Sequence, residues 1–130
     1  IICYESIYGN FVNGFVQNGA NFLAVITNDG WWKNTQGHKQ HLMLSKLRAI
    51  ENRRSLVRAA NTGVSAVINQ KGDIVKRLDY GIKGVIKAKI RLNNNLTFYT
   101  KYGDYIARIS QFLSMLILLT VFLRKRTTIF

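Results

Sequence analysis

The stretch Phe22–Thr27 reads FLAVIT and decides the fold class of this chain. A continuous apolar run of this length, bounded by turn-forming residues, predicts a strand that is buried on both faces of a sheet. Before it, Ile7–Asn18 carries apolar residues at helical spacing and is followed by Gly19, a good helix stop. Ile1-Ile2 predicts the end of an earlier buried strand. Strand, helix and strand in this order predict a crossover unit of an α/β layer.

The residues after this strand predict a loop and then a long helix. Asn28–Gly37 is rich in turn formers, whereas Gln40–Arg54 has apolar residues at the i, i+4 and i+7 positions of a helix. We expect the apolar stripe of this helix to face the core. The stripe consists of Met43, Leu44, Leu47 and Ile50.

Short runs with β-branched residues predict more strands in the second half of the chain. Gln70–Asp73 reads QKGD and predicts a tight hairpin turn between two of them. Arg91–Asp104 is expected to be a connector that leads to the C-terminal segment. The expected strands are Ser55–Ala59, Ser65–Asn69, Ile74–Leu78 and Gly84–Ile90.

The segment Tyr105–Leu123 predicts a transmembrane helix. Its later part is almost unbroken Leu, Ile, Val, Phe and Met, and at 1.5 Å rise per residue it nearly matches a hydrocarbon core of about 30 Å. Arg124-Lys125-Arg126 follows it, so the positive-inside rule predicts a cytoplasmic tail at residues 124–130 and an extracytoplasmic location for residues 1–104. The alternative is a buried core helix at the end of a soluble domain.

The composition, 48% hydrophobic and 12% aromatic, is that of a globular or membrane protein and excludes disorder. The 19 Lys and Arg against 6 Asp and Glu give a net charge of +13, which suits nucleic acid, an anionic membrane surface or acidic substrates. No basic residue precedes Lys33 and three follow the most apolar run, which favours a membrane over nucleic acid. Because the chain opens without a Met, we expect it to be a piece of a longer protein.

Cys3 is the one cysteine, and its position is compatible with two interpretations. It follows a predicted buried strand at the start of a helix, where the turn would expose the sulfur and the helix N-terminus would favour the thiolate of a nucleophile. A free cysteine is, however, among the most buried residue types, so packing alone could also explain it. Glu5 is either a carboxylate that faces a polar site or an exposed residue favoured by the helix dipole.

The aromatic and basic residues of the loop and helix also have alternative explanations. Trp31 and Trp32 are expected either to cap the core or to wall a substrate pocket. His38 and His41 have no acidic or cysteine partner nearby in sequence, which indicates a pair at a helix start and not a metal site. Four arginines are expected to be solvated or paired with Glu51, with contact to anionic lipid headgroups as the alternative. They are Arg48, Arg53, Arg54 and Arg58.

Four stretches together make the chain resemble the apolipoprotein N-acyltransferases, a membrane branch of the carbon-nitrogen hydrolase (nitrilase) superfamily. The resemblance covers nearly the whole chain, in order. Its motifs are ICYE at 2–5, GANFLAVITNDGWW at 19–32, QHLMLSKLRAIENRRSLVRAANTGVSAVINQKGDIV at 40–75 and FYTKYGD at 98–104.

The resemblance implies a fold and a set of site residues. The fold would be the C-terminal part of a nitrilase-type α-β-β-α sandwich (residues 1–104), followed by one transmembrane helix. The family's nucleophile corresponds to Cys3, its supporting residues to Tyr4 and Glu5, and its substrate-binding aromatics to Trp31 and Trp32. Trp32-Lys33 stands where members of the family commonly have Phe-Gly.

The family's catalytic Glu and Lys lie upstream of its nucleophile, so no Glu or Lys of this chain is assigned to those roles. Neither Glu51, Lys33 nor Lys39 matches such a motif. The resemblance therefore implies that this piece is inactive alone.

The resemblance also implies a reaction and its surroundings. A phospholipid would donate an acyl chain through a cysteine thioester to the lipid-modified N-terminal cysteine of an apolipoprotein, at a bacterial inner membrane. It implies no cofactor, no metal and no nucleic-acid partner. Two rivals remain: a soluble nitrilase-type amidase, which would not need a bilayer span, and a non-catalytic, membrane-anchored binding module.

Overall fold

The strands of the chain form one four-stranded sheet in the order β1-β2-β3-β4. A computed structural model describes residues 1–127; residues 128–130, at the end of the predicted tail, lie outside the described part. β1 pairs with β2 in parallel, and the other two pairs are antiparallel. The strands are β1 (Leu23–Thr27), β2 (Leu56–Ala60), β3 (Ser65–Ile68) and β4 (Ile74–Leu78).

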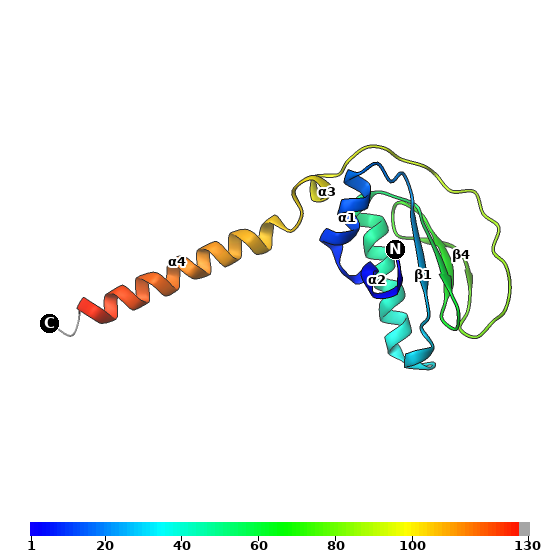
Figure 1. Ribbon diagram of the computed structural model, residues 1–130, viewed down its shortest axis with the longest axis horizontal. Coiled ribbons are helices and arrows are strands. Elements are labelled where there is room, and N and C mark those ends of the chain that lie inside the picture. Colours follow the sequence, from blue (N-terminus) through cyan, green and yellow to red (C-terminus); the bar gives the residue numbers. More distant parts are fainter. Residues whose placement is uncertain (128–130) are drawn as a thin grey trace.

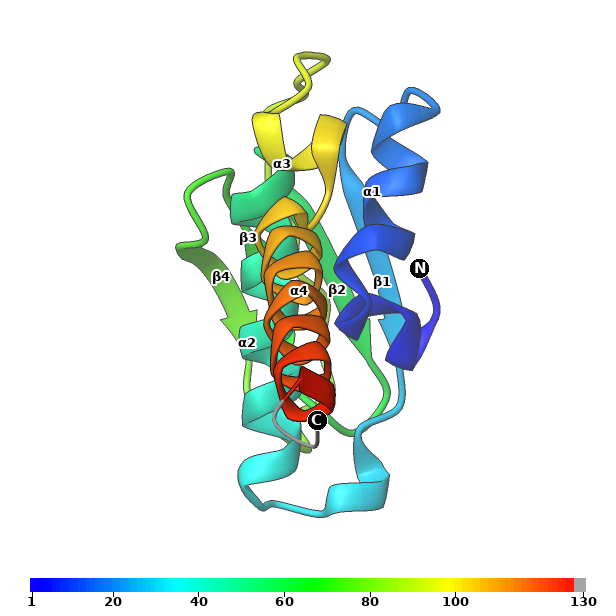
Figure 2. The same ribbon diagram turned by 90° about the vertical axis from the view of Figure 1, so that its left-hand side faces the viewer.

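Helices α1 and α2 cover one face of this sheet, and α4 leads away from the body of the molecule (Figure 1; Figure 2). The short 3₁₀ segments η1 and η2 precede the two covering helices. The helical elements are η1 (Cys3–Ile7), α1 (Gly9–Gln17), η2 (Gly30–Trp32), α2 (Gln36–Asn52), α3 (Phe98–Tyr102) and α4 (Tyr105–Thr127).

The core lies between these helices and the sheet. Val12 and Val16 of α1 pack in one cluster with Leu23 and Val25 of β1, and each is at most 2% exposed. The predicted earlier strand is present as an extended segment whose Ile2 bridges Ile26 in parallel. The predicted crossover therefore exists, and the structure adds a second one, in which α2 connects β1 to the parallel strand β2.

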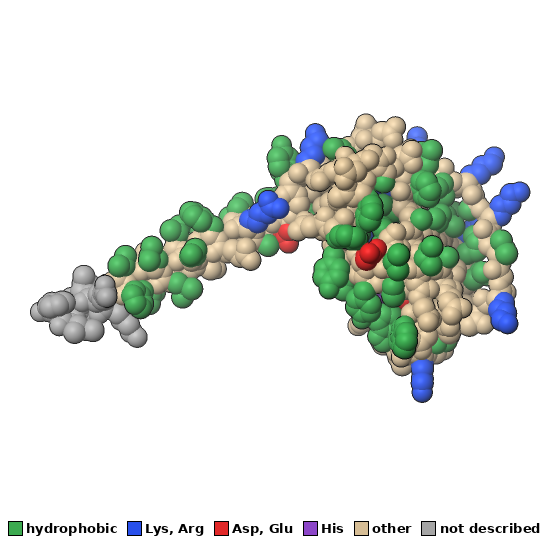
Figure 3. All heavy atoms as spheres, in the orientation of Figure 1, with side chains coloured by type: hydrophobic (Ala, Val, Ile, Leu, Met, Phe, Trp, Pro, Cys, Tyr) green, Lys and Arg blue, Asp and Glu red, His purple; other side chains and the backbone are tan. Residues whose placement is uncertain are grey.

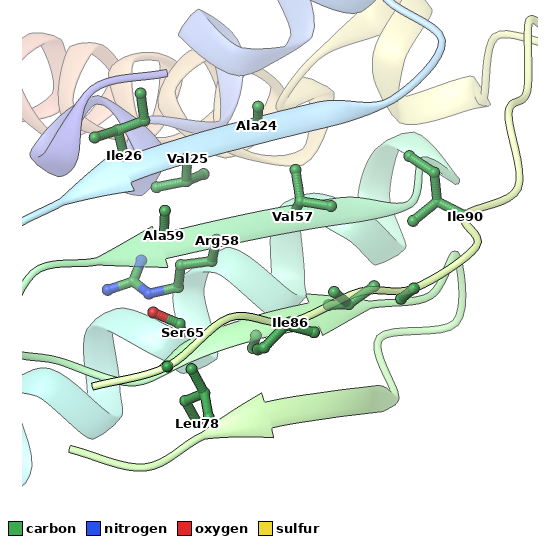
Figure 4. Close-up of a pocket in the computed structure, with 14 residues that line it drawn as sticks. Ala24, Val25, Ile26, Val57, Arg58, Ala59, Ser65, Leu78, Ile86 and Ile90 are labelled. Carbon is green, nitrogen blue, oxygen red and sulfur yellow. The ribbon is translucent and has the colours of Figure 1, made fainter. Parts of the chain in front are cut away.

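Two strand predictions were wrong, and both concern the face of the sheet that α1 and α2 do not cover. β1 is buried on one face only, since Ala24 and Ile26 alternate with its buried residues and line a cavity of about 320 Å³. Gly84–Ile90 lies across this cavity as extended chain outside the sheet (Figure 4). Ile86 and Ile90 point towards the sheet, but this segment forms no ladder with a strand among the described residues.

Helix α2 begins four residues before its predicted start, at Gln36, where the Thr35 hydroxyl accepts a hydrogen bond from the Gly37 amide at 3.3 Å. The predicted apolar stripe does not face the core: Met43 is 59% and Leu47 41% exposed. The buried face is largely polar instead, because its side chains find partners on η1, the loop after β1, β2 and α3. Its buried residues are His38, His41, Leu42, Ser45, Arg48, Ala49 and Asn52.

Helix α4 is long and apolar enough over Tyr105–Arg124 to cross a membrane, by length and composition. None of this stretch is buried, so within residues 1–127 it is not the core helix of the alternative interpretation. Figure 3 shows hydrophobic side chains along its length, with basic side chains at the end nearer the body. Gly103, at φ +66°, ends α3 and lets the chain turn into α4. The predicted division at residues 104, 123 and 130 stays a prediction.

Candidate active site

Cys3 stands where the extended N-terminal segment turns into η1. Its φ of +46° lies in the left-handed region, which costs a non-glycine residue about 1–2 kcal/mol. Two local contacts hold the turn: Glu5 Oε2 accepts a hydrogen bond from the Ile2 amide at 2.6 Å, and Ser6 Oγ donates one to the Cys3 carbonyl at 2.8 Å. Cys3 is only partly buried, and its sulfur lies beside the end of β1.

A chain of hydrogen bonds leads from the sulfur into the protein. Thr27 Oγ1, at the last position of β1, lies 3.3 Å from Cys3 Sγ and 3.0 Å from Asp29 Oδ1. Asp29 Oδ1 also accepts a hydrogen bond from His41 Nδ1 at 2.9 Å. His41 Nε2 lies 2.9 Å from Ser6 Oγ and 3.3 Å from the Cys3 carbonyl oxygen. The network therefore begins and ends on Cys3.

A buried ion pair anchors this network. Arg58 Nη2 donates to Asp29 Oδ2 at 2.6 Å, and both side chains are fully buried. Burial by itself raises the pKa of Asp29, but the hydrogen bond from His41 and the charge of Arg58 outweigh it and lower that pKa. Gly63 packs directly on the carboxylate, since a Cβ there would collide with Asp29 Oδ2. Asp29 is therefore a fixed, ionised acceptor.

Sequence reasoning missed these residues behind the sulfur, although two signals were present. Arg58 is a charge inside an otherwise apolar predicted strand, which requires a partner when that strand is buried. Asp29 lies two residues after β1, at the carboxyl end of a parallel strand, where polar side chains of a site gather in α/β folds. The structure joins the two, and with them the NDGWW and RAANTG motifs.

Two of the aromatic residues near Cys3 are packed against other rings, and one is exposed. Tyr4 and Trp32 both contact the His41 ring, with centroids 5.7 and 5.4 Å away, and line a small pocket of about 150 Å³. Trp31 instead is 80% exposed. The structure thus brings Tyr4 and Trp32 together and leaves Trp31 projecting from the same loop.

The two histidines lie in the first turns of α2, where the helix-start prediction placed them. They have separate partners: His38 packs on the Tyr80 ring with centroids 4.7 Å apart, whereas His41 belongs to the Asp29 network. The expectation that His41 lacks an acidic partner was wrong, because Asp29 reaches it from the loop after β1.

Three of the four arginines are at most 4% exposed, and the expectation that they are solvated or paired with Glu51 was wrong for Arg54 and Arg58. Arg48 pairs with Glu51 at 2.8 Å as predicted, and burial, partly offset by Arg48, raises the pKa of that carboxyl. Arg54 donates to carbonyl oxygens, including those of Ala20 and Asn95 at 2.8 and 2.9 Å. Arg53 alone among the four is exposed, so the alternative of headgroup contact does not fit the others.

Comparison with known families identifies the class of protein. The model of the family "Carbon-nitrogen hydrolase" matches residues 1–95. The chain therefore belongs to the carbon-nitrogen hydrolase family, and the predicted class, a nitrilase-type α/β fold followed by an apolar helix, is confirmed.

Within this family, the resemblance to apolipoprotein N-acyltransferases is also confirmed. The chain is 38% identical to the apolipoprotein N-acyltransferase from Chlorobaculum tepidum and 40% identical to the one from Rhodopseudomonas palustris. Each alignment covers 97% of the present chain. It spans 24% and 23% of those two proteins. A solved structure, Saccharomyces cerevisiae Nit3, aligns with a TM-score of 0.48 at 20% identity, covering 63% of this chain and 33% of that one.

Proposed function

We propose that this chain is the nucleophile-bearing part of an apolipoprotein N-acyltransferase, which moves an acyl chain from a phospholipid to the N-terminal amine of a lipid-modified apolipoprotein. The observation that carries the proposal is the partly buried Cys3, which is held in a left-handed turn with its sulfur hydrogen-bonded to Thr27. The similarity to proteins of this name along nearly the whole chain supports it.

The reaction has two steps. The Cys3 thiolate attacks the ester carbonyl of the phospholipid, and the ester C–O bond breaks to leave a thioester on Cys3 and a lysophospholipid that takes a proton. The amine of the acceptor then attacks the thioester, forming an amide, losing a proton and releasing the thiol. Within residues 1–127 the partner of the sulfur is the Thr27 hydroxyl. We propose that the general base and the oxyanion donor come from other parts of the protein.

The residues flanking the sulfur have supporting roles in this proposal. The Glu5 carboxylate accepts a hydrogen bond from the Ile2 amide and so stabilises the backbone turn that carries Cys3. Tyr4 and Trp32 wall the small pocket beside it, and Trp31 offers an exposed ring to an acyl chain or headgroup.

The function is tested directly by supplying both substrates. The full-length protein that carries this chain, in detergent micelles, is given a phospholipid with a labelled acyl chain and a peptide with an N-terminal diacylglyceryl-cysteine. Label is expected in an amide on the peptide. If label appears only as free fatty acid, with or without the peptide, the protein is a hydrolase instead.

Trp31→Ala is expected to lower acyl transfer several-fold while leaving the unfolding transition within about 0.5 kcal/mol of the wild type, because an exposed ring contributes little to the core. Trp32→Ala is the matched comparison. Since Trp32 packs on Tyr4 and His41, its removal should lower both transfer and stability. Equal losses of stability in the two variants would assign Trp31 to the core after all.

We also propose that α4 spans a bacterial inner membrane with residues 1–104 on the extracytoplasmic side. A reporter enzyme that is active only in the cytoplasm, fused after Phe130, is then expected to be active. A second reporter that is active only in the periplasm, fused at the same position, is the control and is expected to be inactive. Activity of the periplasmic reporter alone would reverse this topology.

A further inference from the structure

The Thr27 hydroxyl has two neighbours but only one proton to donate. It lies 3.3 Å from Cys3 Sγ and 3.0 Å from Asp29 Oδ1. A threonine hydroxyl has one O–H and two acceptor lone pairs, and an ionised carboxylate accepts only. Because the ionised carboxylate is the stronger acceptor, the hydroxyl donates to Asp29 while Cys3 is a thiol, and its lone pairs are free to accept the S–H.

The Asp29 carboxylate has hydrogen-bond partners other than the Thr27 hydroxyl. Oδ1 also accepts from His41 at 2.9 Å, and Oδ2 accepts from Arg58 at 2.6 Å. The carboxylate can thus lose the Thr27 bond and still keep a partner on each oxygen. Nothing else in the network has to move if the hydroxyl proton turns towards the sulfur.

We propose that Thr27 is a catalytic residue that reverses its hydrogen bond when Cys3 ionises, accepting from the thiol and donating to the thiolate. The inference rests on the proposed function, in which the thiolate is the nucleophile. The proton that leaves Cys3 goes to solvent or to the general base, while Thr27 only rotates its own O–H and transfers no proton. Asp29 acts through Thr27 and is a positioning residue, fixed by Arg58 and His41.

Two substitutions at position 27 separate the hydroxyl from the shape of the side chain. Val has the shape of Thr without the hydroxyl, whereas Ser keeps the hydroxyl and loses the methyl group. Thr27 is 5% exposed at the end of β1, where Val is also a favoured strand residue. Thr27→Val is therefore the informative variant and Thr27→Ser the matched control, with Thr27→Ala in reserve should Val disturb the fold.

The experiment measures the rate at which iodoacetamide alkylates Cys3 in the full-length protein, followed by peptide mass spectrometry from about pH 6 to about pH 10. Only the thiolate reacts, so the rate at each pH reports its fraction. Hydrogen bonds to charged groups are about twice as strong as neutral ones. We therefore expect Thr27→Val to react about tenfold more slowly near neutral pH and to approach the wild-type rate at high pH, and Thr27→Ser to follow the wild-type profile.

Two results would overturn the inference. One is a wild-type profile for folded Thr27→Val, and the other is a loss of rate by the same factor at every pH, which indicates changed access to the sulfur. The readout does not use acyl transfer. A failure of the proposed function, seen as transfer that survives removal of Cys3, is therefore distinguishable from a failure of the Thr27 inference.

Discussion

Replacing Cys3 with Ala is expected to abolish the acyl-enzyme and acyl transfer altogether. The thioester needs a sulfur at this position, and within these 130 residues there is no second cysteine to replace it. Intact-protein mass spectrometry after incubation with phospholipid should show an added acyl mass in the wild type and none in the variant. Hydroxylamine should remove the added mass, since it cleaves thioesters.

Retention of a hydroxylamine-sensitive acyl mass in Cys3→Ala would contradict the assignment of the nucleophile. Cys3→Ser is a useful companion, because it keeps a small polar side chain in the left-handed turn. It should fold like the wild type and carry no thioester. Thermal unfolding of both variants checks that loss of the acyl-enzyme does not come from loss of structure.

Replacing Arg58 with Met is expected to lower the free energy of unfolding by about 3–5 kcal/mol, because it leaves the Asp29 carboxylate buried without its countercharge. Denaturant unfolding followed by tryptophan fluorescence measures this loss. Arg53→Met is the matched control. The same chemical change at this exposed arginine should stay within about 0.5 kcal/mol of the wild type.

The dependence on pH identifies Asp29 as the cause. Its pKa is lowered in the folded protein, so its contribution to stability is present above the ordinary value of about 3.9 and is lost as the pH falls through the lowered value. In Arg58→Met, protonating Asp29 removes an uncompensated charge, so the deficit relative to the wild type should shrink in acid. A deficit that does not change with pH would indicate lost packing of the Arg58 side chain instead.

Much of the fold could be predicted from local patterns. β4 was predicted at its observed bounds, and β1 and β2 to within one residue, because apolar runs bounded by turn residues are local signals. The stripe on α2 could not be placed in this way. Its buried face is held by partners distant in sequence, such as the Arg58 side chain that donates to Ser45 at 2.8 Å. A rule based on periodicity alone assigns the apolar face to the core.

In the candidate site, too, the local features could be predicted and the contacts between distant residues could not. Cys3 and its neighbours form a continuous motif, so their importance could be inferred from the letters and the resemblance. The partnership of Thr27, Asp29 and His41 depends on α2 crossing beside the end of β1, which no sequence spacing reveals. Burial of three arginines was missed for a related reason, since each one is satisfied by acceptors on other elements.

The contact of Gly63 with Asp29 has a consequence for how this protein can vary. The turn that carries Gly63 is sixty positions from Cys3 along the chain, yet any side chain there must displace the carboxylate that orients the Thr27 hydroxyl. In a saturation-mutagenesis map scored by survival, this turn should rank with the nucleophile's own neighbours. The tolerance of this turn to mutation is thus expected to be set by the carboxylate behind the sulfur.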